Sequence, residues 1–127
     1  MPDPHCSAEV LVFNDCGATA DISICHSIGA GTVESTTWKG VAYGATTSGP
    51  LTVRYVLGDR NLDWWYCELT VGEVTYHSPG TWLQPDKECL LESADNGQTL
   101  VFSASLTAFN INMPSGGCST YMTDGGI

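Results

Sequence analysis

The chain has 127 residues, 43% of them hydrophobic, and a formal net charge of -10 at pH 7. This length predicts one domain over residues 1–127, with enough apolar side chains for a packed core. Fourteen acidic side chains against four basic ones repel phosphates, which argues against nucleic acid and anionic membrane surfaces as partners. No apolar run reaches the roughly 20 residues that a membrane-spanning helix needs.

The cysteines are even in number and dispersed, with no C-x-x-C pair. Such a pattern in a small chain predicts three disulfides and therefore an oxidising compartment, which indicates a secreted, extracellular protein. The candidates are Cys6, Cys16, Cys25, Cys67, Cys89 and Cys118.

The first elements are two short alternating runs. Helix signals are nearly absent, and turn residues separate short β-forming segments, so the whole chain is predicted to be all-β. Residues 8–13 (AEVLVF) and 19–25 (TADISIC) flank the turn residues NDCG, which predicts an opening β-hairpin. The hairpin would bring the two strand ends together and leave His26, beside Cys25, as a surface imidazole.

The predicted hairpin also suggests which cysteines pair. It brings Cys6 close to Cys25 and holds Cys16 at its other end, too far from Cys25 for a bond. The pairing favoured on this basis is Cys6–Cys25, Cys67–Cys89 and Cys16–Cys118.

Residues 27–50 are predicted to form a long connecting segment that carries Trp38 and Tyr43. The run 51–57 (LTVRYVL) then alternates apolar and polar residues, which predicts a half-buried strand with Arg54 on its outer side.

The next stretch, residues 63–78 (DWWYCELTVGEVTYHS), is predicted to be a hairpin. Gly72 and Glu73 fit a two-residue type II′ turn, which requires glycine at its first central position. The resulting register pairs Val71 with Val74 and Glu68 with His77. Period two then separates an apolar face from a mixed one. The apolar face holds Trp65, Cys67, Leu69, Val71, Val74 and Tyr76, and the mixed face holds Trp64, Tyr66, Glu68, Thr70, Thr75 and His77.

The last third of the chain predicts a further hairpin. Residues 88–93 and 98–106 lie on either side of an Asn-Gly turn signal, and residues 107–112 (TAFNIN) predict one more strand. Seven to nine short strands at this spacing predict a two-sheet antiparallel β-sandwich, with a small barrel as the alternative.

The mixed face of the 63–78 hairpin is the predicted binding site. An exposed platform of Trp64 and Tyr66, edged by Glu68, His77 and Arg54, would suit sugars, whose C–H faces stack on aromatic rings. The competing interpretation is that the loop 27–50 or the tail covers these aromatics. The favoured function is a non-enzymatic, secreted, lectin-like module for neutral glycans, because negative charge does not disfavour uncharged saccharides.

Two other functions remain open. The chain could be a protein-binding inhibitor, toxin or effector that uses loops 27–50 and 79–87, with Trp38, Tyr43 and Trp82. It could also be a small hydrolase in which Glu68 and His77 form an acid–base pair.

A calcium site is the weak metal candidate. Asp59, Asn61 and Asp63 begin a calcium-loop pattern, but Trp64 replaces its glycine and Thr70 its final glutamate. The pattern therefore favours an ordinary polar turn, and no cofactor is expected.

Overall fold

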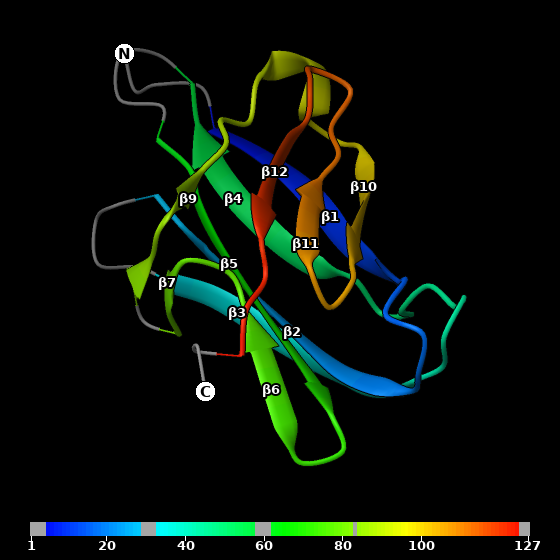
Figure 1. The fold of residues 1–127 in the computed structure, drawn as a ribbon. Coiled ribbons are helices and arrows are strands. Elements are labelled where there is room, and N and C mark those ends of the chain that lie inside the picture. The colour runs from blue at the N-terminus through cyan, green and yellow to red at the C-terminus, as the bar shows by residue number, and fades with distance from the viewer. Residues whose placement is uncertain (1–4, 29–32, 58–61, 83, 125–127) are drawn as a thin grey trace.

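A computed structural model describes residues 5–28, 33–57, 62–82 and 84–124. These residues are almost entirely β-structure, as predicted, with one short 3₁₀ helix, η1 (Ser93–Asp95) (Figure 1). Within them, no helix is long and apolar enough to span a membrane.

The strands form two large sheets and one small one. The first sheet has the order β12 (Cys118–Tyr121), β11 (Ala108–Ile111), β10 (Thr99–Ala104), β1 (His5–Asn14) and β4 (Leu51–Val56). The second has the order β3 (Val33–Val41), β2 (Ala20–Ser27), β5 (Trp64–Val71) and β6 (Val74–His77), and β9 (Lys87–Glu88) pairs with the start of β5. The small sheet pairs β7 (Gly80–Thr81) with β8 (Gln84–Pro85).

The predicted opening hairpin is wrong, because β1 and β2 lie in different sheets. β1 pairs antiparallel with β4 and parallel with β10, so the first sheet is mixed rather than wholly antiparallel. The segment between β1 and β2 crosses from one sheet to the other. The buried Asn14 amide holds that crossing by donating to the carbonyl oxygens of Ala18 and Val41.

The predicted hairpin of residues 88–93 and 98–106 is also wrong. β9 pairs with β5, whereas β10 lies between β1 and β11. The Asn-Gly segment instead joins the chain to β1, where the Gly97 amide donates to the Ser7 carbonyl oxygen at 2.8 Å. The predicted strands at 51–57 and 107–112 are confirmed as β4 and β11.

The disulfide pattern differs from the prediction. One bond joins Cys89 to Cys118, and the other four cysteines, all within the described residues, are free thiols. The pairings Cys6–Cys25, Cys67–Cys89 and Cys16–Cys118 are therefore wrong. They depended on the opening hairpin, whereas Cys6 lies opposite Tyr55 in one sheet and Cys25 opposite Tyr66 in the other.

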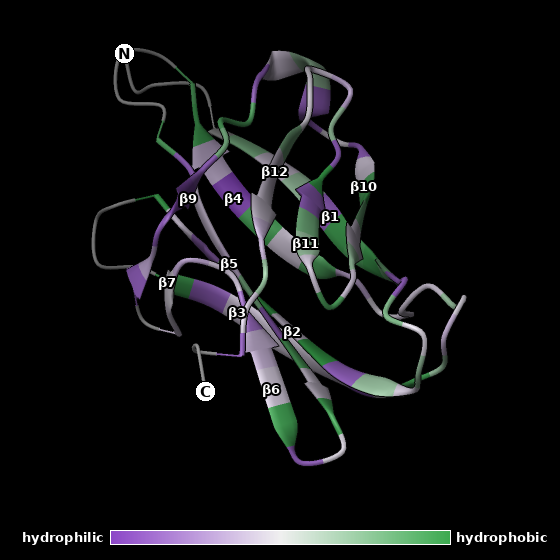
Figure 2. Cartoon of the chain, in the orientation of Figure 1, coloured by the Kyte–Doolittle hydropathy of each residue, from purple (hydrophilic) through white to green (hydrophobic). Residues whose placement is uncertain are grey.

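The two large sheets share one hydrophobic core. The alternation along β4, which Figure 2 shows by hydropathy, turns Val53 into this core and Arg54 to solvent. From the second sheet, the Trp65 ring meets Phe102 of β10 edge-on, with ring centroids 5.0 Å apart. Burying such aromatic side chains on both sheets stabilises their association.

Candidate functional site

The β5–β6 hairpin has the predicted register. Val71 pairs with Val74 and Glu68 with His77. Gly72 has a φ of +61°, and Glu73 does not have a positive φ, which is the combination that a type II′ turn requires. The local turn chemistry therefore sets this register.

The apolar face of the hairpin enters the core only along part of its length. Trp65, Cys67 and Leu69 are fully buried, as predicted. Val74, however, is 43% exposed, because the turn end of the hairpin extends beyond the rest of the structure (Figure 1). The prediction that Val74 belongs to the core is wrong.

The other face of the hairpin is not an open platform. Tyr66 is only 4% exposed and Trp64 is half-buried, so Tyr66 cannot present its ring to a ligand. The neighbouring strand β8 contacts both β2 and β5. Its approach depends on Gly80, where φ is +105° and any Cβ would collide with the carbonyl oxygen of Gln84. β8 therefore lies close to β2 and β5, and it is neither the loop 27–50 nor the tail, the two coverings that the competing interpretation named.

The polar groups of that face have separate partners. The Tyr66 hydroxyl donates to Glu68 Oε2 at 2.8 Å, and burial followed by the Glu68 contact raises the pKa of Tyr66. His77 Nδ1 lies 2.9 Å from the Ser78 carbonyl oxygen, to which its N–H can donate. Among the described residues, no ion pair joins Glu68 to His77. Arg54 is absent from this face, because it lies on β4 in the other sheet.

The calcium candidate falls partly outside the described residues, which exclude Asp59 and Asn61. Asp63 is fully buried, and its two carboxylate oxygens bind the His26 ring and the Leu91 amide. Within the described ranges, no group of three or more histidine, cysteine, aspartate or glutamate side chains is arranged to hold a metal ion.

His26 is placed differently from the prediction. Instead of a surface imidazole, it is a fully buried side chain whose two ring nitrogens contact Glu34 and Asp63. The sequence offered little signal for this cluster, because its three members are separated along the chain. They meet only when β2 pairs with β3 on one side and with β5 on the other.

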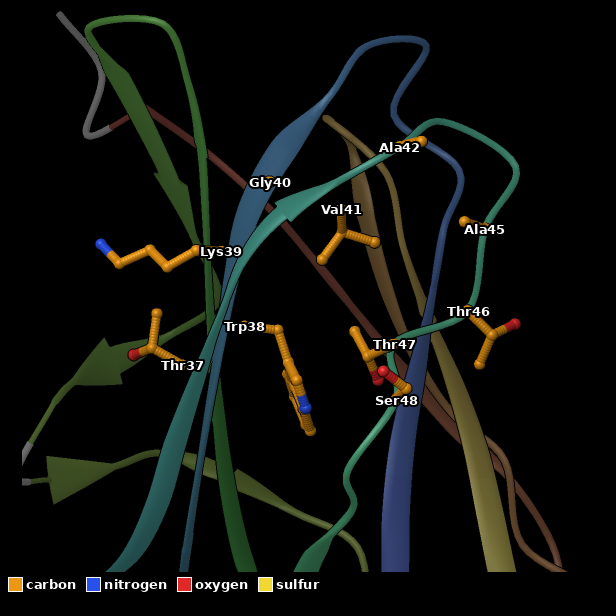
Figure 3. Close-up of a pocket in the computed structure, with 10 residues that line it drawn as sticks. All are labelled: Thr37, Trp38, Lys39, Gly40, Val41, Ala42, Ala45, Thr46, Thr47 and Ser48. Carbon is orange, nitrogen blue, oxygen red and sulfur yellow. The ribbon is translucent and has the colours of Figure 1, made fainter.

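A groove of about 440 Å³ lies between the end of β3 and the following loop (Figure 3). The Trp38 indole projects from β3 toward the loop segment that carries Thr47 and Ser48. Its Nε1 donates to the Gly49 carbonyl oxygen at 2.8 Å. Trp38 is 9% exposed, so only a small part of its indole is open to the groove. The lining residues are Thr37, Trp38, Lys39, Gly40, Val41, Ala42, Ala45, Thr46, Thr47 and Ser48.

Hydrogen bonds to β1 and within the loop hold the loop in place. The buried Thr47 hydroxyl accepts a hydrogen bond from the Val12 amide at 3.0 Å, and the Thr47 amide donates to the Val12 carbonyl oxygen at 2.9 Å. The Ala45 amide donates to the Ala42 carbonyl oxygen, which closes a tight turn. Tyr43 lies within this turn and is 58% exposed.

The groove is almost free of charge. Among the described residues, Lys39 is the one ionisable residue of the lining, and Figure 3 shows its side chain pointing away from the groove. Its ammonium group lies 3.6 Å from Asp21 Oδ2. The remaining lining offers hydroxyl groups, backbone groups and small apolar side chains. The sequence predicts Trp38 and Tyr43 as loop residues for a protein partner, but Trp38 lies on β3, so the prediction of a connecting segment throughout 27–50 is wrong. No family model matches the chain, and a search of curated proteins finds no match.

Proposed function

We propose that the protein is a non-enzymatic binding module that holds a neutral saccharide in the groove between β3 and residues 42–48. The observation that carries this proposal is a groove lining that, in the described part of the chain, has no acidic side chain and one basic side chain, that of Lys39, which points away from the groove, in a chain whose formal net charge is -10 (Figure 3). A ligand site for cations in so acidic a protein would be expected to use carboxylates, and an anion would meet long-range repulsion. A neutral ligand faces neither restriction.

The chemistry of the lining fits a sugar. Ser48 and Thr37 are exposed and carry hydroxyl groups that can both donate to and accept from sugar hydroxyls. The exposed part of the Trp38 indole and the side chains of Val41 and Ala45 can contact the C–H surfaces of a sugar ring. Tyr43, exposed beside the groove, can stack against a neighbouring sugar unit.

The proposed site replaces the hairpin as the place of binding. The predicted platform of the 63–78 hairpin needs two exposed aromatic rings. Tyr66 is buried and Trp64 is half-buried, so Trp64 alone presents part of a ring to solvent. We retain the predicted ligand class, an uncharged glycan, and transfer it to the groove.

Two broader expectations belong to the same proposal. We propose that the protein is secreted, which the Cys89–Cys118 disulfide supports. We also propose that the two large sheets are the layers of a β-sandwich, which their shared core supports. Detection of the protein only in a reducing compartment would contradict the first, and an experimental structure whose two sheets share no core would contradict the second.

Two similarly exposed tyrosines provide the main test. Tyr43 beside the groove is 58% exposed, and Tyr121 on β12 is 60% exposed. Binding of neutral oligosaccharides is first identified on a glycan array and then measured by calorimetry for Tyr43→Ala and Tyr121→Ala. Loss of one stacked ring removes about 1 kcal/mol, so we expect Tyr43→Ala to weaken binding by about fivefold to tenfold and Tyr121→Ala to leave it unchanged. Equal affinities of both variants and the parent would contradict the proposal.

A filling substitution provides a second test. Ser48→Trp places a large side chain at the groove, whereas Ser35→Trp places the same side chain at an exposed position of β3 outside it. We expect saccharide binding to be lost only in Ser48→Trp, with both variants retaining the far-ultraviolet circular dichroism of the parent.

Three outcomes would favour the other functions. Binding that disappears in Trp64→Ala but survives in Ser48→Trp would return the site to the hairpin. Tight capture of a protein without any saccharide signal would favour the inhibitor, toxin or effector function. Turnover of a substrate that is abolished by Glu68→Gln would show an enzyme.

A further inference from the structure

His26 lies between two carboxylates that approach opposite sides of its ring. Nδ1 is 2.8 Å from Glu34 Oε1, and Nε2 is 2.7 Å from Asp63 Oδ1. An ionised carboxylate only accepts hydrogen bonds, and a neutral imidazole has only one N–H to donate. With both carboxylates ionised, both contacts are hydrogen bonds only when the ring carries a proton on each nitrogen.

Each carboxylate ties the ring to a different part of the fold. On the Glu34 side, the two carboxylate oxygens accept from the Arg54 backbone N–H at 3.0 and 3.1 Å, which links β3 of the second sheet to β4 of the first. On the Asp63 side, Oδ2 accepts from the Leu91 N–H at 2.8 Å, and the backbone carbonyl oxygen accepts from the Cys89 N–H. The cluster therefore joins the β3–β4 seam to the segment that carries the disulfide.

No other buried cation balances these two carboxylates within the described residues. The Arg54 guanidinium is 3.7 Å from Glu34 Oε2, but its side chain is 78% exposed and its charge is solvated. Tyr55, the other titratable group that β4 contributes nearby, has a pKa raised by burial and by surrounding negative charges, including Asp63. The remaining neighbour is the Trp65 ring, with its centroid 4.6 Å from that of His26.

The balance of these effects has a clear direction. Burial lowers the pKa of His26, but its hydrogen bonds to Asp63 and Glu34, together with their negative charges, outweigh burial and raise that pKa above the ordinary value. A raised pKa in the folded state means that the cluster adds stability below the unfolded pKa of histidine. This stability is lost as pH rises through the folded pKa.

We propose that His26 is a protonation lock, in which the doubly protonated ring holds Glu34 and Asp63 together and keeps the seam between β3 and β4 closed. Loss of one ring proton to solvent leaves two carboxylates competing for a single N–H. The freed carboxylate then repels its counterpart, and the seam opens at the Glu34–Arg54 contact. The lock is closed below the raised pKa of His26 and opens as pH rises through that pKa, independently of any saccharide.

Nuclear magnetic resonance tests the protonation state in the intact protein. The ¹⁵N shifts of the His26 ring are expected to show two N–H groups below its titration midpoint, and this midpoint is expected to lie above the ordinary histidine pKa of 6.5. A His26 midpoint at or below 6.5, or a ring that holds a single proton at mildly acidic pH, would overturn the proposal.

Amide exchange tests the opening itself. After correction for the intrinsic dependence of exchange on pH, protection of the Arg54 amide is expected to fall as His26 deprotonates, whereas the Val71 and Val74 amides of the distant hairpin turn keep theirs. Unchanged Arg54 protection across the His26 titration would show that the ring does not lock the seam.

A conservative variant keeps the proposal testable if His26 itself cannot be replaced without unfolding. Glu34→Gln removes one negative charge and retains an oxygen for the Arg54 amide. We expect both the His26 midpoint and the loss of Arg54 protection to move together to lower pH. The matched variant Glu73→Gln, at the exposed hairpin turn, is expected to move neither; a shift of one midpoint without the other would contradict the coupling.

Discussion

Asp63 and Asp95 are both fully buried carboxylates, but the fold satisfies them in different ways. Asp63 faces the imidazole of His26 and accepts from one backbone N–H, that of Leu91. Asp95 has three neutral donors: the backbone N–H of Glu92 at 2.8 Å, the backbone N–H of Ser115 at 3.0 Å and the Ser115 hydroxyl at 2.6 Å.

The difference concerns which environment depends on pH. The neutral donors around Asp95 keep their protons throughout the range in which the protein would be studied, so that cluster changes only when the carboxylate itself is protonated. The donor at Asp63 is a histidine, whose proton can be lost. The hydrogen bonds of Asp63 therefore depend on the protonation of His26, whereas those of Asp95 do not depend on a titrating donor. Substituting each carboxylate separately, and measuring stability against pH, tests this difference.

The largest effect is expected for Asp63→Asn. It removes one partner of a buried charge pair and places an amide where His26 and Leu91 both donate, which lowers the free energy of unfolding by about 3–5 kcal/mol. Denaturant unfolding measured from about pH 6 upward gives the test. Because the parent loses the His26 contribution as pH rises, the difference between variant and parent should shrink with pH. If the difference in free energy of unfolding between Asp63→Asn and the parent did not change with pH, the Asp63 cluster would not depend on a titrating donor, and it would not differ from the Asp95 cluster in this respect.

The disulfide connects the two clusters, so its removal is the next test. The Cys89 amide donates to the Asp63 carbonyl oxygen, and Cys118 follows shortly after Ser115, which binds Asp95. Replacing both cysteines by serine opens a covalent loop with a sequence separation of 29 residues. We expect a loss of about 2–4 kcal/mol in the free energy of unfolding. Amide exchange should rise at both Leu91 and Ser115, and a rise at only one would show that the clusters are not linked through this bond.

The contrast between local and long-range structure explains what the sequence could predict. The β5–β6 register follows from one turn, and Gly72 supplies the backbone conformation that the turn needs. The parallel pairing of β1 with β10 joins residues about 90 positions apart, for example Glu9 with Thr99. No short-range pattern encodes such a pairing, so the NDCG segment was interpreted as a hairpin turn although it connects two sheets.

The candidate sites show the same limit. The aromatic pattern around Tyr66 predicts an exposed platform, but Tyr66 is buried in a sheet whose strands β2 and β5 are also approached by β8. The groove beside Trp38 arises because residues 46 and 47 pack against β1. The His26 cluster needs β2 between β3 and β5. In each case, the residue types were visible in the sequence, and the tertiary neighbours that decide their role were not.

Asp95→Asn makes the same substitution in the neutral cluster. The amide keeps one acceptor oxygen but turns an NH₂ group toward donors, so we expect a loss of about 1–2 kcal/mol in the free energy of unfolding. The loss of free energy should be the same at about pH 6 and about pH 9, because the Glu92 N–H, the Ser115 N–H and the Ser115 hydroxyl do not titrate in this range. A pH-dependent loss would mean that the titrating group of the Asp63 cluster also governs Asp95.

Glu68 extends the comparison to a carboxylate that is only half-buried, and the smallest effect is expected here. Tyr66→Phe removes the hydroxyl that donates to Glu68 Oε2 while retaining the buried ring. Water can reach Glu68 and replace the lost donor, so the free energy of unfolding should fall by no more than about 1 kcal/mol. Thermal unfolding at neutral pH measures this, and Thr75→Val on the adjacent strand, which removes an exposed hydroxyl bonded to Thr70, is the matched control. If Tyr66→Phe lowered the free energy of unfolding as much as Asp63→Asn, the cost of removing a carboxylate's hydrogen-bond partner would not depend on the burial of the carboxylate or on the charge of the partner.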